Sequence, residues 1–394
     1  MRNKNNYDKN SLNITMIGHK RIPSREGGVE IVVNELSKRI NKRGHKVTVY
    51  NRKGNHVSGK NFNNEYRAME SLNTDYDNIT IKEVFTIDKK GLAALTSSIS
   101  ATLCTIYKSK FKKERCDCIH YHAEGPSAMV VLARLFGIRT VVTIHGLDWQ
   151  RAKWGGIAVR YLKFGERMAA KYADEVIVLS ENVKSYFIKK YSRETIFIPN
   201  GITRPQIVES VVIKNKWNIS KDEYILYLGR IVPEKGLHYL IEAFKQIWTD
   251  KKLIIAGGAS DTSEYVLNMK KLSENDERIV FLDFVQGREL EELYSNAYLY
   301  CLPSDLEGMP LSLLEAMSYG NCCIVSDIPE CLEVVEDKGI SFKKGSVNDL
   351  KMVLESCIND TEKVKKYKSE AAEFIVKKYN WDEVVDRTIN LYSR

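Results

Sequence analysis

Short apolar runs alternate with segments of helical apolar spacing along the second half of the chain. The runs predict strands, and the segments between them predict helices. Strands that alternate with helices indicate a parallel sheet covered on both faces. The predicted strands are 224–228, 253–256, 279–282, 298–302 and 322–325, and the predicted helices are 236–247, 261–275, 287–296, 309–319, 329–336, 346–358, 361–378 and 381–392.

The first half follows the same pattern less regularly. Residues 51–80 are polar and poorly periodic, which indicates a hairpin and a loop. The predicted strands here are 12–18, 46–50, 81–85, 118–122, 140–146, 175–180 and 195–198, and the clearest helices are 29–43, 91–111 and 157–172. We therefore expect an α/β protein of two domains. It would have a disordered tail at 1–11, domains at 12–205 and 206–375 joined near 202–222, and a C-terminal helix at 376–394 that crosses back to the first domain.

The stretch from Ser304 to Gly320 predicts the end of a strand, a tight loop and a helix in succession. Pro310 suits the first turn of the helix, and Gly320 suits its C-terminal end. The helix is apolar on nearly every side, so we expect it to be buried. Its one carboxylate, Glu315, should then have a hydrogen-bonding partner, because an unpaired carboxylate is costly to bury.

Glu307 lies just before the start of this helix, where free backbone N–H groups favour an anion. Two glutamates, a helix end suited to phosphate and the C-terminal edge of a strand together indicate a site for a sugar nucleotide. The stretch also fits a buried helix whose glutamate is tied to the backbone, since buried carboxylates serve structure as well as function.

Two cations flank the turn that follows the predicted strand at 224–228. They are Arg230 and Lys235, and the turn ends at Gly236. A pair of cations at the C-terminal edge of a strand suits a pyrophosphate, which an arginine can hold through two parallel hydrogen bonds.

The first half offers weaker candidates at the ends of its strands. Gly27 and Gly28 precede a helix and can let the backbone approach a ligand closely, although a glycine pair also fits a flexible turn. His145 ends the predicted strand at 140–146, at the edge where open parallel sheets bind ligands. A single histidine at a strand end is more often structural, and the same ambiguity applies to His120 and His122.

The charge of the chain is uneven. The net charge of +9 arises because residues 1–205 hold 36 Lys and Arg against 19 Asp and Glu, whereas the remainder is acidic. A basic half indicates an anionic partner. Within it, the predicted helix at 157–172 carries a basic stripe, which fits anionic lipid headgroups but also a solvated face. The stripe consists of Arg160, Lys163, Arg167 and Lys171.

Composition excludes several classes of protein. No apolar run approaches the roughly 18 residues of a membrane-spanning helix. The polar N-terminus lacks the apolar core of a signal peptide. The eight cysteines are scattered, which favours reduced thiols in a cytoplasmic protein. A nucleic-acid-binding module is disfavoured, because the basic stretches lack interleaved aromatic residues and any recognised motif.

Taken together, the motifs resemble the retaining glycosyltransferases of family 4. The segment 18–30, which includes Gly27-Gly28, is similar to that of members acting in bacterial capsule or exopolysaccharide assembly. The chain departs from the commonest form at Met309 and Pro310, where many members have Phe-Gly. The resemblance rests on Pro199-Asn200-Gly201, Gly229-Arg230 with Lys235-Gly236, Gly257-Gly258, Phe284-Val285, Pro303-Ser304, and Glu307 followed by Glu315 in Glu-Ala-Met-Ser-Tyr-Gly.

The resemblance implies a GT-B fold, in which two Rossmann-like domains with parallel sheets face each other across a cleft. It also implies the role of each candidate residue. Arg230 and Lys235 would bind the donor diphosphate, Glu307 the sugar hydroxyls, Glu315 the ribose, and Val285 the base through its backbone. Gly308, Met309 and Pro310 would bring the helix start to the sugar and phosphate, Gly27 and Gly28 would close on the phosphates, and His145 would contact the sugar.

The activity implied is transfer of a sugar, with retention, from a UDP- or GDP-sugar to a saccharide acceptor that is lipid-linked. The attack would be front-side, without metal or cofactor, in cell-surface polysaccharide synthesis. The protein would lie at the cytoplasmic face of the plasma membrane, with its basic half towards the lipid. The alternative is a nucleotide-sugar epimerase or a phosphorylase on the same fold, which an assay without acceptor would separate.

Overall fold

The computed structural model describes residues 11–54, 79–89, 91–151, 154–258 and 263–393. These residues form two compact units. The first contains the residues up to Gln150, Trp154–Pro199 and the segment from Asp382 onward, and the second is built from Asn200–Trp381. The predicted tail, apart from Ser11, lies outside the described residues, as does most of the polar segment predicted at 51–80.

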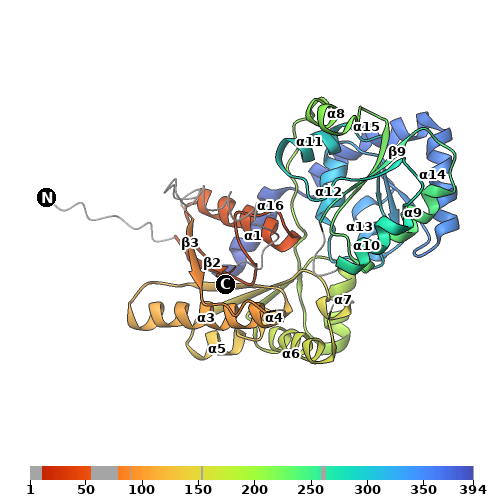
Figure 1. The fold of residues 1–394 in the computed structure, drawn as a ribbon. Coiled ribbons are helices and arrows are strands. Elements are labelled where there is room, and N and C mark those ends of the chain that lie inside the picture. The colour runs from red at the N-terminus through yellow and green to blue at the C-terminus, as the bar shows by residue number, and fades with distance from the viewer. Residues whose placement is uncertain (1–10, 55–78, 90, 152–153, 259–262, 394) are drawn as a thin grey trace. The chain divides into compact units, whose positions relative to one another are not determined.

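A seven-stranded parallel sheet forms the centre of the first unit (Figure 1). The direction in which successive strands are added reverses between β1 and β4, and such a switch point opens a crevice at the C-terminal edge of a parallel sheet. In spatial order the strands are β3 (Thr80–Val84), β2 (Lys46–Arg52), β1 (Asn13–Ile17), β4 (Cys118–His122), β5 (Arg139–Ile144), β6 (Glu175–Val178) and β7 (Ile196–Phe197).

Helix α1 (Gly28–Lys42) buries one face, as its apolar spacing predicts. Its buried apolar residues are Val32, Val33, Leu36 and Ile40. The other helices are α3 (Leu92–Phe111), α4 (Glu124–Ser127), α5 (Val130–Leu135), α6 (Gly156–Tyr172), α7 (Glu181–Tyr191) and α16 (Trp381–Tyr392), with a short 3-10 turn at Asp148–Gln150.

A six-stranded parallel sheet forms the second unit, with its switch point between β8 and β11. The strands in spatial order are β10 (Ile279–Phe281), β9 (Lys252–Ala256), β8 (Tyr224–Leu228), β11 (Leu299–Leu302), β12 (Cys323–Ser326) and β13 (Ile340–Phe342). The helices are α8 (Val212–Trp217), α9 (Leu237–Lys245), α10 (Ser263–Leu272), α11 (Gly287–Asn296), α12 (Leu311–Ser318), α13 (Pro329–Val335), α14 (Val347–Asn359) and α15 (Thr361–Lys378), with a 3-10 turn at Pro233–Lys235.

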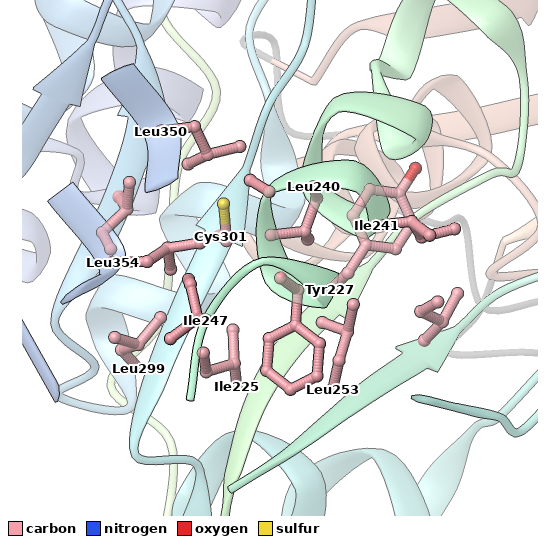
Figure 2. Close-up of a cluster of buried hydrophobic side chains, with 14 of the residues drawn as sticks. Ile225, Tyr227, Leu240, Ile241, Ile247, Leu253, Leu299, Cys301, Leu350 and Leu354 are labelled. Atoms are coloured by element: carbon pink, nitrogen blue, oxygen red, sulfur yellow. The ribbon is translucent and has the colours of Figure 1, made fainter. Parts of the chain in front are cut away.

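One face of the second sheet packs against α9 and α14 to form a continuous apolar core. Figure 2 shows Ile225 of β8 and Leu299 of β11 among the side chains that meet there. Removal of this apolar surface from water is the main force that holds the helices on the sheet. The labelled members are Ile225, Tyr227, Leu240, Ile241, Ile247, Leu253, Leu299, Cys301, Leu350 and Leu354, all essentially buried.

The junction between the units differs from the predicted boundary. Residues 200–205 belong to the second unit, although we predicted them in the first. Ile202 pairs with Asn380 in an isolated parallel bridge, and a Cβ on Gly201 would lie 2.4 Å from the ring of Trp381. These contacts tie the segment after Pro199 to the residues that follow α15, and 376–381 also belongs to the second unit.

One local prediction is left untested, and one helix was missed. The hairpin and loop predicted at 51–80 fall mostly outside the described residues, where only the two ends are seen: β2 continues to Arg52, and β3, which begins at Thr80, runs parallel to it. Helix α8 was not predicted at all, because its short apolar pattern gives no helical signal of its own. A carboxylate from α11 supplies the missing cap: Glu292 Oε2 accepts hydrogen bonds from the backbone N–H groups of Val211, Val212 and Ile213 at 2.7–3.1 Å.

Candidate functional site

The candidate residues of the second unit lie on loops at the C-terminal edge of its sheet. Arg230 follows β8, Val285 follows β10, and Glu307 lies between β11 and α12. Since β8 and β11 are the neighbours at the switch point, their loops lie at the place where open parallel sheets typically bind ligands.

Lys235 and Glu307 form a mostly buried ion pair at this edge. The Nζ of Lys235 lies 2.5 Å from Oε1 of Glu307, and the two side chains are 13% and 6% exposed. Ser304 donates a hydrogen bond to the same oxygen at 2.6 Å, and Ser326 fixes Ser304 by donating to its backbone carbonyl at 2.5 Å. The carboxylate is thus held in one orientation by two donors, and its second oxygen remains the one that can accept from a ligand.

Close backbone packing brings this pair together. Gly236 has a φ of +64°, and a Cβ there would lie 1.9 Å from the carbonyl oxygen of Pro303. The backbone N–H of Asp305 also donates to the carbonyl of Glu234 at 2.9 Å. The loop after β8 therefore rests directly on the loop after β11, and only glycine fits at the point of contact.

Glu315 has the hydrogen-bonding partner that its burial required. It is half-buried on α12, and the hydroxyl of Tyr294 donates to its Oε2 at 3.2 Å. Tyr294 also stacks on Tyr319, with ring centroids 5.2 Å apart. The expected partner is confirmed, and it is a tyrosine side chain of α11. Helix α12 itself begins at Leu311, so Pro310 caps the helix and does not lie in its first turn as predicted.

The remaining loop residues of this unit are placed as follows. Met309 precedes the cap, and its sulfur accepts from the backbone N–H of Asn200 at 3.0 Å. Arg230 is half-buried. The loop that carries it is in direct backbone contact with the loop after β9, because a Cβ on Gly257 would lie 1.8 Å from the carbonyl oxygen of Gly229. Val285 is 7% exposed.

In the first unit, Gly27 and Gly28 stand at the start of α1 as predicted, but the carboxylate of Glu30 lies directly beside them. Gly27 caps the helix, and a Cβ on it would lie 2.5 Å from Oε2 of Glu30. Burial acts to raise the pKa of Glu30, but the charge and backbone N–H of Lys20 outweigh it, and the pKa is lowered. A phosphate bound here would lie beside this anion, so the phosphate role of Gly27 and Gly28 stays a prediction.

Histidines gather at the C-terminal edge of the first sheet. His122 ends β4, and its Nδ1 lies 3.0 Å from Nε2 of His145, which follows β5. His120 is buried between Thr143 and Tyr392, at 2.7 and 2.8 Å. Burial lowers the pKa of His120 to about 3. Of these histidines, only His145 is partly exposed, so it is the one whose side chain can meet a ligand.

Sequence reasoning missed two further polar groups. His19 is buried against Asn51 at 3.0 Å, and burial lowers its pKa to about 4. Glu124 follows β4 and is fully buried, with the backbone N–H of Asp148 donating to Oε2 at 3.0 Å. Burial raises the pKa of Glu124 well above its usual range, and the nearby Asp148 and Glu166 act in the same direction. Both could have been found from their positions, because His19 directly follows the predicted strand 12–18 and Glu124 lies two residues after the predicted strand 118–122.

Glu166 of α6 is the neighbour that remains ionised. Burial acts to raise its pKa, but hydrogen bonds from Lys190, Tyr191, Tyr186 and Trp149 outweigh it and lower the pKa. Trp149, Tyr186 and Lys190 donate at 2.8–2.9 Å. This network anchors the inner face of α6 and the turn after His145, which leaves the basic stripe of α6 on the outside.

Comparisons with known proteins cover nearly the whole chain. Residues 26–204 match the family model described as Glycosyltransferase Family 4, and residues 211–388 match the model described as Glycosyl transferases group 1. The chain is 29% identical over 289 residues to YqgM of Bacillus subtilis, an uncharacterized glycosyltransferase, across 71% of this chain and 79% of that protein.

A second relative has a named reaction. The chain is 28% identical over 310 residues to the UDP-Gal:alpha-D-GlcNAc-diphosphoundecaprenol alpha-1,3-galactosyltransferase of Escherichia coli, across 74% of this chain and 78% of that protein. Among solved structures, Anabaena Alr3699/HepE in complex with UDP and glucose has a TM-score of 0.76 at 16% identity, across 97% of this chain and 99% of that chain. At that identity the likeness shows the fold, and the predicted GT-B class is confirmed.

Proposed function

Because this chain is a glycosyltransferase of the family-4 type with a GT-B fold, we propose that it transfers a sugar from a nucleotide-diphosphate donor to a lipid-linked saccharide acceptor, with retention of configuration. The observation that carries the proposal is the oriented Lys235–Glu307 pair at the switch point of the second sheet. The Escherichia coli relative, which acts on a diphosphoundecaprenol-linked sugar, supports the acceptor class. We further propose that the transfer belongs to cell-surface polysaccharide synthesis.

The proposed donor contacts follow from what each side chain offers. Arg230 and Lys235 would hold the diphosphate, and Glu307 would accept hydrogen bonds from the sugar hydroxyls through the oxygen that Lys235 and Ser304 leave open. Glu315, oriented by Tyr294, would bind the ribose hydroxyls. Gly308, Met309 and Pro310 would lie against the sugar and phosphate, and Val285 would meet the base through its backbone.

In the proposed reaction, the acceptor oxygen bonds to the anomeric carbon on the face from which the diphosphate departs. The bond from that carbon to the phosphate oxygen breaks, and the departing phosphate takes the acceptor proton. Negative charge therefore grows on the diphosphate, where Arg230 and Lys235 would stabilise it. Such preorganised electrostatic stabilisation is usually the largest single contribution to a rate enhancement.

Thermal unfolding with a panel of UDP-, GDP-, ADP- and dTDP-sugars tests the proposal. A ligand that binds only the folded state raises the melting temperature, by a stabilisation of about 2.7 kcal/mol at one hundred times its dissociation constant. We expect sugars of one nucleotide class to raise the melting temperature. The UDP-sugars are the first candidates, because the Anabaena neighbour was solved in complex with UDP. Free sugars serve as the control, and no shift with any nucleotide sugar would contradict the proposed donor site.

Independence from metal is part of the same proposal. Within the described ranges, no three His, Cys, Asp or Glu side chains gather so that they could hold a metal ion. Asp75 and Asp77 have the spacing of an Asp-x-Asp metal motif, but both lie outside the described residues. The test is to measure transfer in the presence of EDTA and again with added Mg²⁺ or Mn²⁺. We expect full activity in EDTA, because Arg230 and Lys235 would offset the charge of the diphosphate without a metal ion.

We further propose that α6 rests on an anionic membrane at the cytoplasmic face. Its outer face exposes Ile157 (87% exposed) and Phe164 (50% exposed) among the four basic residues of the stripe. Apolar side chains interleaved with cations suit the boundary between headgroups and acyl chains. No described helix is long and apolar enough to cross a membrane.

Co-sedimentation with vesicles tests this surface. Replacing all four basic residues of the stripe with glutamine should abolish binding to vesicles that contain anionic lipid, because each contributes about 1 kcal/mol near such a surface. The matched control removes the same charge from the second unit, at the exposed residues Lys343, Lys344, Lys365 and Lys366. Equal loss of binding in both variants would show a non-specific charge effect and contradict the assignment to α6.

A further inference from the structure

Three side chains form a hydrogen-bonded row across neighbouring strands of the first sheet. Met16 lies on β1, His122 ends β4, and His145 follows β5. The Nε2 of His122 lies 3.4 Å from Sδ of Met16, and its Nδ1 lies 3.0 Å from Nε2 of His145. Met16 and His122 are fully buried, whereas His145 is partly exposed.

His122 is neutral in this row. Burial lowers its pKa well below the usual range, and His120, His145 and His19 act in the same direction. The ring of His120 stacks on it with centroids 4.1 Å apart, a spacing at which two charged rings would repel. A neutral imidazole carries its proton on one nitrogen and a lone pair on the other.

The sulfur of Met16 decides which nitrogen carries the proton. A thioether can accept a hydrogen bond but cannot donate one. With the proton on Nε2, His122 donates to Met16 and accepts at Nδ1 from His145. With the proton on Nδ1, the lone pair of Nε2 would face the lone pairs of sulfur in the buried interior, and an unsatisfied buried group costs about 1–3 kcal/mol. The first arrangement therefore dominates.

We propose that His122 is a positioning residue, which accepts a hydrogen bond from Nε2–H of His145 and thereby fixes the tautomer of His145. The tautomer of a histidine is set by the bond that one of its nitrogens makes. In this tautomer, the lone pair of His145 is on Nδ1. The inference rests on the proposed function together with the role that the family resemblance implies for His145, which is contact with the donor sugar. It adds that Nδ1 of His145 is an acceptor, so a sugar hydroxyl that meets this nitrogen would donate to it.

The tautomer can be measured without any substrate. In full-length protein labelled with ¹⁵N at histidine, the ring-nitrogen shifts distinguish a protonated nitrogen from one with a lone pair, and His145→Gln identifies the signals. We expect Nε2 of His145 to be protonated. A proton on Nδ1 would overturn the proposal. The expected tautomer together with no use of any nucleotide sugar would overturn the proposed function and leave the positioning role intact.

Two variants of His122 then separate positioning from packing. In His122→Asn, the Oδ1 takes a place near that of Nδ1 and keeps the acceptor, so the tautomer of His145 should persist. In His122→Phe the acceptor is lost, so both tautomers should appear and kcat/KM should fall at least about tenfold, the lower end of losses for orienting partners of histidine. Unchanged tautomer and kinetics in the Phe variant would overturn the proposal.

A third variant serves if His122→Phe does not fold. Met16→Leu conserves volume but removes the sulfur acceptor, so the Nε2 proton of His122 loses its partner. The tautomer bias of His145 should then weaken although neither histidine has been changed. A spectrum identical to that of the wild type would show that Met16 does not set the row and would overturn the argument.

Discussion

Glu307→Gln should lower the turnover number for glycosyl transfer by at least about 100-fold, the scale of losing one preorganised polar group in an active site. The glutamine keeps the shape and can still accept from Ser304, but it loses the charge. Lys235, which is 13% exposed, then loses its ionic partner, and the sugar hydroxyls lose a charged acceptor. Steady-state kinetics with the donor identified by thermal shift measures the effect.

The control for this variant removes a carboxylate from the same region. Glu234→Gln changes a half-exposed residue next to Lys235. Glu234 accepts hydrogen bonds from the loop after β11 through its backbone carbonyl, which the substitution keeps. It should retain turnover. The melting temperature of both variants shows whether each is folded, because removing one partner of a buried pair can destabilise the protein by about 3–5 kcal/mol. A folded Glu307→Gln protein with wild-type turnover would show that the carboxylate does not act on the donor.

The double variant Arg230→Ala/Lys235→Ala should lose more, by several kcal/mol of transition-state stabilisation in combination. Loss of one stabilising group typically costs about 10²–10³ in turnover. Here both cations proposed to offset the charge on the departing diphosphate are gone. The loss should appear chiefly in the turnover number, because the charge grows in the transition state.

The two single variants show how much of the loss in turnover comes from the missing contacts with the diphosphate. Lys235→Ala also removes the partner of Glu307, whereas Arg230→Ala leaves that pair untouched, so Arg230→Ala is the cleaner test. A double-mutant cycle measures the coupling between them. Lys343→Ala with Lys344→Ala, two exposed lysines, is the control of equal charge. Normal turnover of the folded Arg230/Lys235 double variant would contradict the assignment of the diphosphate.

Several features of the candidate site could be read from the sequence because they are local. The apolar run at 298–302 and the helix at 309–319 lie within one or two residues of β11 and α12. Their order places Glu307 in the loop between them. Glu315 stands in an otherwise apolar helix, which was enough to require a partner. The residue that fills this role, Tyr294, could not be identified, because it comes from another helix.

Features that depend on distant residues could not be predicted, whereas one local contact was overlooked. Helix α8 exists because Glu292, about 80 positions away, caps its free N–H groups. The strand β3 pairs in parallel with β2, and the segment between them gave no pattern from which to predict this. The carboxylate of Glu30 at the start of α1 was not considered, although it lies only three residues after Gly27.

The sequence by itself determined the α/β class, the two-domain order and the strand edges that carry polar residues, since these depend on periodicity and on turn residues within short windows. Only the tertiary structure decided which edges meet. Lys235 reaches Glu307 across 72 positions because β8 and β11 are neighbours and because Gly236 lets their loops touch. The row from Met16 to His145 likewise depends on the order β1-β4-β5. The pairing of strands is set by packing of the whole sheet, which no local pattern encodes.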